Sequence, residues 1–225
     1  MFGALELHSP ELFYKKTRIE NYKYTFYFGA VLVIAFYNLF IYLYSREKLY
    51  LYYLLYVFSF AIWISLYRGY AFYFIDHNLY NILQIIIPFF FMLLILFSHL
   101  VLKTKELLPK IHIVFKFFTY LFISSMILMT FHLQDGYYFM NLTAVLLLPI
   151  LMFTSLIVIH KGEKPARIYL LALAIFFIGM AMFTLLALGE YPYSNIIRNI
   201  PAIGSFFEII LFSLLLAYRI NTLKE

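Results

Sequence analysis

The 225-residue sequence contains no cysteine, and this absence removes several chemistries at once. Without thiols the chain has no disulfide bond, no thiolate metal site and no cysteine nucleophile. Charged side chains are also scarce, at 12% of residues, and a soluble domain needs more of them to cover its surface. The chain is therefore neither a disulfide-stabilised scaffold nor a typical soluble domain.

Enzyme signatures are missing as well. The six histidines show neither the i, i+4 spacing of a metal-binding helix nor a nearby acidic cluster. Gly204-Ser205 lacks the flanking glycine pattern of a nucleophile elbow, and the last apolar segment has no central lysine that could hold retinal. We expect no catalytic residue, no metal and no cofactor, so the chain is not expected to be an enzyme.

Hydrophobic residues make up 65% of the chain, and the mean hydropathy is +0.89. They form seven apolar segments, each close to the roughly 20 residues that cross a bilayer. The segments are Tyr24–Leu43, Leu49–Tyr67, Ile82–Leu102, Ile111–Met129, Phe139–His160, Ile168–Leu188 and Ile200–Ile220. This pattern predicts an all-α membrane protein, a seven-transmembrane helix bundle whose short connections make neighbouring helices antiparallel.

Basic residues concentrate in alternate gaps between these segments, and this sets the expected orientation. One side holds 11 of the 17 lysines and arginines: Arg46, Lys48, Lys103, Lys105, Lys110, Lys116, Lys161, Lys164, Arg167, Arg219 and Lys224. The positive-inside rule makes this side cytoplasmic, with the N-terminus outside and the C-terminus inside. Contact with anionic membrane lipids explains the net charge of +6, so no nucleic-acid partner is expected.

Four positive charges before the first segment, at Lys15, Lys16, Arg18 and Lys23, oppose this orientation. The opposition disappears if a long translocated domain normally precedes them, and Met1–Pro10 lacks the features of a signal peptide. We therefore expect this start to be a truncation. The expected parts are an extracytoplasmic juxtamembrane segment over 1–21, the bundle over 22–220 and the start of a cytoplasmic signalling helix over 221–225.

Polar groups at membrane depth carry the most information, because burying them is costly. Glu208 is central in the last segment, and Ser205 lies three residues before it on the same helical face. Glu208 is either a structural acid bonded to a neighbouring helix or a switch whose pairing changes with signalling state. Further candidates for the same interior network are Asn38, Gln84, Ser98, His99, Asn141 and Thr143.

Tyrosines crowd the first predicted cytoplasmic turn, at Tyr42, Tyr44, Tyr50, Tyr52, Tyr53 and Tyr56. An interfacial aromatic belt explains them. An aromatic ligand pocket is the alternative, which spacing alone does not support.

Four motifs in order carry a family resemblance: Tyr37-Asn38-Leu39-Phe40, the tyrosine-rich run 50–56 with Tyr52 and Tyr53, the run 164–172 with Pro165 and Arg167, and the pair of runs 203–208 and 216–220 with Gly204, Glu208 and Arg219. In these motifs the chain resembles the transmembrane region of bacterial seven-transmembrane receptors with diverse intracellular signalling modules. The family pattern usually has an acidic residue before the last arginine, where this chain has Tyr218.

The resemblance implies a receptor in the bacterial inner membrane that passes an extracytoplasmic or intramembrane signal to a cytoplasmic output. Such outputs are typically histidine kinase, diguanylate cyclase, phosphatase or adenylate cyclase modules, and here an output of histidine kinase or diguanylate cyclase type is expected, in the same chain or as a partner. A homodimer is expected because these outputs act as dimers. Gly179 and Ala172 are candidate close-packing positions, although no strong small-residue motif locates an interface.

Two other classes stay open on the residues alone. One is a small transporter or channel whose pathway is lined by Asn38, Gln84, His99, Asn141 and Glu208. The other is a stand-alone bundle that scaffolds or regulates a separate signalling protein. Substrate flux into liposomes would separate the transporter from the other two.

Overall fold

The computed structural model describes residues 10–187 and 195–224, and within these ranges the chain is helical with no strand. The elements are α1 (Pro10–Ser45), α2 (Lys48–Tyr67), the 3-10 helix η1 (Tyr70–Tyr73), α3 (His77–Leu83), α4 (Ile86–Val101), α5 (Thr104–Leu107), α6 (Pro109–Phe131), α7 (Leu133–His160), α8 (Pro165–Ala187) and α9 (Asn195–Lys224). Seven spans are long and apolar enough to cross a membrane, with α3 and α4 joined in one of them. The predicted seven-helix membrane bundle is confirmed.

Local sequence explains where the helices turn. Gly69 and Gly162 adopt positive φ angles of 78° and 93° at the ends of α2 and α7, a conformation that costs glycine little. The side chain of Asp76 caps α3 by accepting a 2.9 Å hydrogen bond from the backbone N–H of Leu79. Pro109 and Pro165 begin α6 and α8, where the missing N–H of proline has no helical partner to lose.

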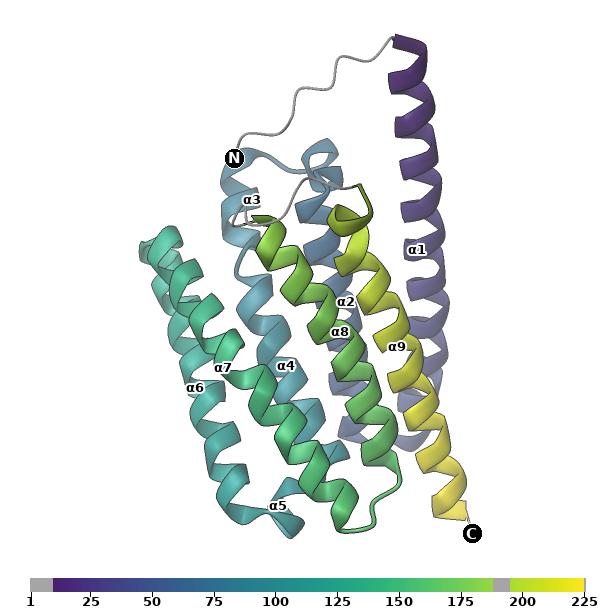
Figure 1. Cartoon of the computed structure of the whole chain (residues 1–225), viewed down its shortest axis with the longest axis vertical. Helices are drawn as coiled ribbons and strands as arrows, with labels where there is room; N and C mark the ends of the chain where they lie inside the picture. The colour runs from purple at the N-terminus through teal and green to yellow at the C-terminus, as the bar shows by residue number, and fades with distance from the viewer. Residues whose placement is uncertain (1–9, 188–194, 225) are drawn as a thin grey trace.

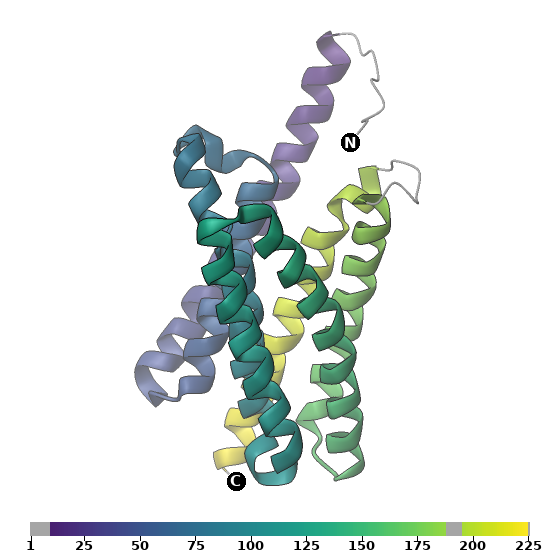
Figure 2. The same cartoon turned by 90° about the vertical axis from the view of Figure 1, so that its left-hand side faces the viewer.

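The seven spans form a closed ring in chain order. Each long helix packs on the next, from α1 through α2, α4, α6, α7 and α8 to α9, and α9 closes the ring against α1. Contacts of α2 with α9 and of α4 with α8 cross the interior. The first turns of α1 extend beyond the bundle, and α9 ends at the opposite end (Figures 1 and 2).

The interior of the ring is rich in aromatic side chains. Tyr50, Tyr53 and Tyr56 of α2 are at most 1% exposed, whereas Tyr44 at the end of α1 is 93% exposed. The belt interpretation is therefore wrong for these three tyrosines. The reason is that α2 contacts α1, α4 and α9 and turns this face inward.

Small residues let α8 and α9 approach closely. A Cβ atom at Gly179 would lie 2.9 Å from Cγ2 of Ile200, and one at Gly204 would lie 3.7 Å from the carbonyl oxygen of Ile175. Ala172 is completely buried. Gly179 and Ala172 therefore pack inside the chain, between α8 and its neighbours.

The turn between α6 and α7 generates a prediction, because a Cβ atom at Gly136 would lie 2.6 Å from the backbone nitrogen of Met129. Backbone atoms cannot move aside, so we expect Gly136→Ala to lower the free energy of unfolding by about 1–3 kcal/mol or more. The measurement is unfolding of the purified protein in mixed micelles.

Gly29 is the matched control, since a Cβ atom there meets nothing within 4 Å. Gly29→Ala should be neutral or stabilise by up to about 1 kcal/mol, because alanine favours a helix. Equal stability of the two variants would contradict the packing described for the turn.

Candidate functional site

The polar centre of the bundle is Glu208, near the middle of α9. Its side chain is completely buried, and Oε2 accepts a 2.6 Å hydrogen bond from the hydroxyl of Tyr56 on α2. No hydrogen bond reaches Oε1 from the described residues. The carboxyl group therefore has one filled and one unfilled acceptor inside the protein, and an unfilled buried acceptor is costly.

Three tyrosines of α2 donate hydrogen bonds to α9. Tyr50, Tyr53 and Tyr56 are spaced by three residues, which puts them on one helical face, and we call them the tyrosine stripe. The hydroxyl of Tyr53 donates to the carbonyl oxygen of Ile209 at 2.6 Å, and that of Tyr50 donates to the carbonyl oxygen of Leu216 at 3.3 Å. With the bond from Tyr56 to Glu208, the tyrosine stripe connects the antiparallel helices α2 and α9. The sequence analysis had assigned these side chains to the membrane–water interface.

On its other side α9 is bonded to α1, and the order of the pairs shows that the two helices run parallel. The hydroxyls of Tyr27 and Ser205 share a 3.1 Å hydrogen bond. The amide of Asn38 donates to Ser213 Oγ at 3.2 Å and to the carbonyl oxygen of Ile34 at 2.9 Å. Ser205 and Asn38 therefore take part, like Glu208, in the polar contacts between α9 and its neighbours.

Aromatic rings surround the next turn of α9 at Phe212. Its ring stacks on that of Tyr169 from α8, with centroids 5.4 Å apart and planes at 14°, and lies 4.9 Å from that of Phe97 on α4. The hydroxyl of Tyr169 is hydrogen-bonded to that of Ser98 on α4. These contacts connect α4 and α8 to the turn that follows Glu208.

The structure separates the other predicted network residues from Glu208. Gln84 and Asn141 line an open cavity beside α3 and α7, and Asn141 is exposed. His99 Nδ1 is hydrogen-bonded to the hydroxyl of Thr104, and its ring stacks on that of His112 with centroids 4.3 Å apart. Thr143 donates within its own helix, to the carbonyl oxygen of Phe139 at 2.8 Å. One continuous interior network was therefore the wrong expectation.

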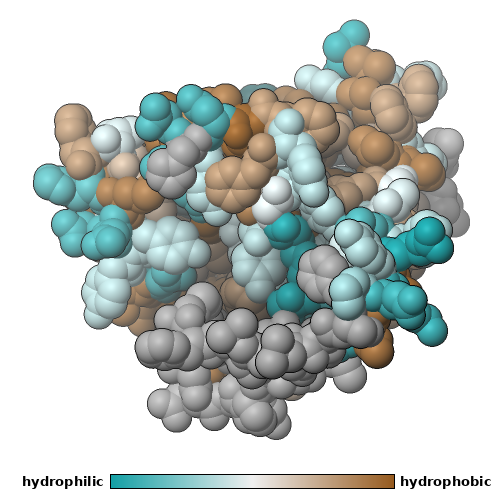
Figure 3. Space-filling view, turned by 90° about the horizontal axis from the view of Figure 1, so that it is seen from above, coloured by the Kyte–Doolittle hydropathy of each residue, from teal (hydrophilic) through white to brown (hydrophobic). Residues whose placement is uncertain are grey.

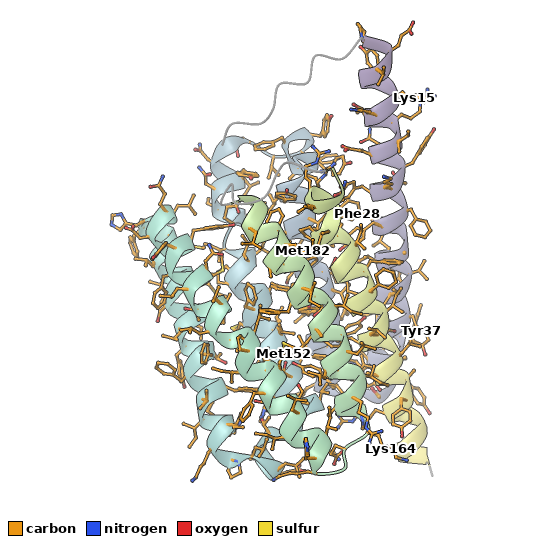
Figure 4. The ribbon with its side chains drawn as sticks, viewed as in Figure 1. Lys15, Phe28, Tyr37, Met152, Lys164 and Met182 are labelled. Atoms are coloured by element: carbon orange, nitrogen blue, oxygen red, sulfur yellow. The ribbon has the colours of Figure 1, made fainter. Side chains whose placement is uncertain are left out.

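The residues of the family motifs divide into buried and surface sets. The buried set comprises Asn38, Tyr53, Gly204 and Glu208. All of these except Gly204 make hydrogen bonds between α9 and a neighbouring helix. The surface set comprises Tyr37 and Arg167, with Tyr52 half-buried, and Tyr37 points away from the bundle in Figure 4. Pro165 begins α8, and a guanidinium nitrogen of Arg219 donates to the carbonyl oxygen of Leu100 at 3.3 Å.

An ion-pair cluster that the sequence analysis missed lies near the end where α1 begins. Glu20 pairs with Arg68, at 2.9 Å, and with Arg198, so that one carboxylate joins α1 to α9 and to the end of α2. The Arg68 guanidinium also lies 4.3 Å from the ring centre of Tyr24, whose hydroxyl donates to Asn199 Oδ1 at 2.7 Å. The sequence did contain a signal for this cluster, because an acidic residue and two arginines lie near the ends of segments that meet on one side of the predicted membrane.

In the same cluster, the hydroxyl of Tyr70 in η1 donates to Asn21 Oδ1 at 3.1 Å, and burial raises the pKa of Tyr70. This tyrosine therefore keeps its proton, and with it the donor of that hydrogen bond, at neutral pH. The described residues contain no group of three or more potential metal ligands.

A family model described as 7TM diverse intracellular signalling matches residues 20–219 of the chain. The match runs from Glu20 of the ion-pair cluster to Arg219 and so includes every contact of α9 described above. No curated protein and no solved structure matches the chain.

The bond between Tyr56 and Glu208 gives a second prediction. Tyr56→Phe keeps the ring but removes the hydrogen-bond donor to a buried carboxyl group, so we expect it to lower the free energy of unfolding by about 1–3 kcal/mol. Unfolding in mixed micelles measures this. Tyr52→Phe is the control on the same helix, since Tyr52 is half-buried and its hydroxyl makes no hydrogen bond with the described residues. Equal losses in the two variants would show that the Tyr56 hydroxyl contributes nothing specific.

Proposed function

The chain belongs to the 7TM diverse intracellular signalling family, and from this membership we propose that it relays a signal across the membrane through α9 to an intracellular output. Family membership makes it a transmembrane domain of the kind found in signalling receptors. In this proposal the chain itself catalyses no reaction. The output is of histidine kinase or diguanylate cyclase type, in the same chain or as a separate partner, and the receptor works as a homodimer in a bacterial inner membrane.

The proposed orientation puts the C-terminal end of α9 in the cytoplasm. The basic connections near α5 and between α7 and α8 lie at the same end of the bundle as the end of α9, as Lys164 shows in Figure 4. There Lys103 Nζ pairs with Glu163 at 2.8 Å, and Lys161 Nζ donates to the carbonyl oxygen of Leu107 at 2.6 Å. Basic residues gathered at one end support a cytoplasmic location for that end.

The observation that carries the proposal is the line of hydrogen bonds along α9. Bonds from α1 and α2 reach α9 at Asn199, Ser205, Glu208, Ser213 and Leu216. The bonds from α1 alone run from Asn199 to Ser213, so a change in the position of α1 alters polar contacts over about four turns of α9. Glu208 supplies an alternative arrangement, because its unfilled Oε1 can accept a donor when the helix rotates or slides. A helix with two arrangements close in energy is what a relay requires.

The transporter interpretation needs a pathway through the polar residues assigned to it. The structure puts Gln84 and Asn141 in an open cavity and His99 beside Thr104 and His112. Asn38 bonds Ser213 of α9, and Glu208 of the same helix bonds Tyr56 of α2. These three groups favour local roles over a shared pathway. A scaffold that acts on a separate protein uses the same movement of α9 and differs from the proposal only in how its partner is attached.

Glu208→Gln tests the relay. In a receptor that carries an output domain, we expect the half-maximal signal to shift by about fivefold or more, because allosteric coupling typically amounts to about 1–3 kcal/mol. The shift should follow from the extra N–H donors of glutamine, which change the relative stability of the two α9 arrangements. Glu106→Gln is the control, since Glu106 is exposed on α5. An unchanged dose response in folded protein would remove Glu208 from the mechanism.

The absence of cysteine makes the movement of α9 directly measurable. Spin labels on cysteines introduced at Tyr218 and Lys110, both exposed, report the distance between the ends of α9 and α6 in lipid nanodiscs. The relay predicts two distance populations whose ratio changes in Glu208→Gln and not in Glu106→Gln. A single, unchanged distance would contradict it.

The output is tested with the native protein. An antibody against the bundle should recover, from membranes of the source organism, either a chain much heavier than 26.9 kDa or a complex that contains a kinase or cyclase. Sequencing the additional mass identifies the output. A protein of 26.9 kDa without such a partner would contradict the proposal, and substrate flux in liposomes would then be the next measurement.

A further inference from the structure

A groove lined by carboxamide and tyrosine side chains lies between α3 and the start of α7, away from the contacts of α9. Its cavity measures about 500 Å³, within the roughly 300–1,000 Å³ typical of small-molecule sites. The lining residues are Tyr80, Asn81, Gln84, Leu133, Gln134, Tyr137, Tyr138 and Asn141. The groove lies toward the end of the bundle where α1 begins, opposite the basic connections, and Figure 3 views the molecule from that end.

Two polar helical faces oppose each other across this groove. On α7, residues 134, 137, 138 and 141 are separated by three or four positions and share one face. On the other side, residues 80, 81 and 84 form a similar face at α3 and its end. Polar side chains of membrane helices usually face the interior of a bundle or a water-filled cavity, and here they line the cavity.

The chemistry of the lining selects for a neutral ligand with many hydroxyl groups. Four of the eight residues carry carboxamides, each of which can both donate and accept hydrogen bonds, and none carries a charge. Within the described part of the chain, the side chains of Gln84 and Gln134 make no hydrogen bond. The amide nitrogen of Asn141 donates to the carbonyl oxygen of Tyr137 at 2.9 Å, and its side-chain oxygen accepts no hydrogen bond from the described residues.

The tyrosines supply flat apolar surfaces beside these amides. Tyr138 is 75% exposed and Tyr137 is 40% exposed, so both rings are accessible from the groove and its rim. The ring of Tyr80 stacks on that of Phe72 of η1, with centroids 4.4 Å apart and planes at 20°. Aromatic faces next to carboxamides match a pyranose ring, which has apolar C–H faces and hydroxyl groups around its edge.

We propose that this groove binds a neutral sugar, either as a free saccharide or as the headgroup of a glycolipid. The carboxamides of Gln84, Gln134 and Asn141 bond its hydroxyl groups, and the tyrosine rings cover its C–H faces. This binding is measured on the bundle alone, so its test is independent of the proposed relay through α9.

The experiment uses the full chain in phosphatidylcholine nanodiscs. Binding of maltose and cellobiose is followed by saturation-transfer NMR, and in a second arm the nanodiscs contain a monoglucosyl diacylglycerol. We expect at least one of these probes to bind and its affinity to fall tenfold or more in Gln134→Ala and in Tyr138→Ala. Both residues are exposed, and the unfolding transition of each variant verifies that it is folded.

Tyr120→Ala is the matched control, because Tyr120 is an exposed tyrosine on α6 that does not line the groove. It should leave the affinity unchanged. Binding of the saccharides identifies a soluble sugar as the source, and binding only to the glycolipid nanodiscs identifies a lipid headgroup. The proposal is overturned if folded wild-type protein binds none of the probes, if Tyr120→Ala weakens binding as much as the groove variants, or if choline or glucuronate binds more tightly than the sugars.

Discussion

The bundle depends on the hydrogen bond between Tyr56 and Glu208, because a carboxyl group at the centre of a membrane bundle needs a protein donor in place of water. That requirement fixes the rotation of α9, since Glu208 must face α2. With this rotation set, Ser205 and Ser213 reach α1, and Phe212 enters the aromatic cluster of α4 and α8. The helix that closes the ring is thus positioned by polar contacts, while apolar packing fills the space around it.

The same contacts explain how a tightly packed bundle can still change state. Aromatic rings around Phe212 are close-packed, and close-packed interiors resist gradual deformation. The polar line beside them contains two unfilled acceptors, Glu208 Oε1 and Asn38 Oδ1, among the described residues. Both belong to contacts of α9 with its neighbours. A small rotation of α9 can bring a donor to one of these acceptors, so this helix has an alternative arrangement of its polar contacts.

Hydropathy was sufficient to predict the seven membrane-spanning helices, because a helix that crosses a bilayer must be long and apolar, and such a segment is easily recognised in the sequence. Periodicity also put Ser205 and Glu208 correctly on one face. It could not identify the partner of that face, so Tyr50, Tyr53 and Tyr56 were assigned to the interface although they lie in the interior. The sequence analysis included Asn141 in the interior network for a related reason, since a polar residue in an apolar segment can face a groove as well as a core. The pairing of Glu20 with Arg68 and Arg198 depends on how three distant segments meet, which no local pattern encodes.

The length of α1 gives the ion-pair cluster a mechanical meaning. At 1.5 Å per residue its 36 residues span about 54 Å, well beyond the roughly 30 Å hydrocarbon core of a bilayer. Glu20 divides this rod into arms of about 15 Å and about 38 Å at that rise. The ion pairs of Glu20 therefore anchor α1 between its two arms, so that a force on the outer arm reaches α9 through Arg198 and the end of α2 through Arg68.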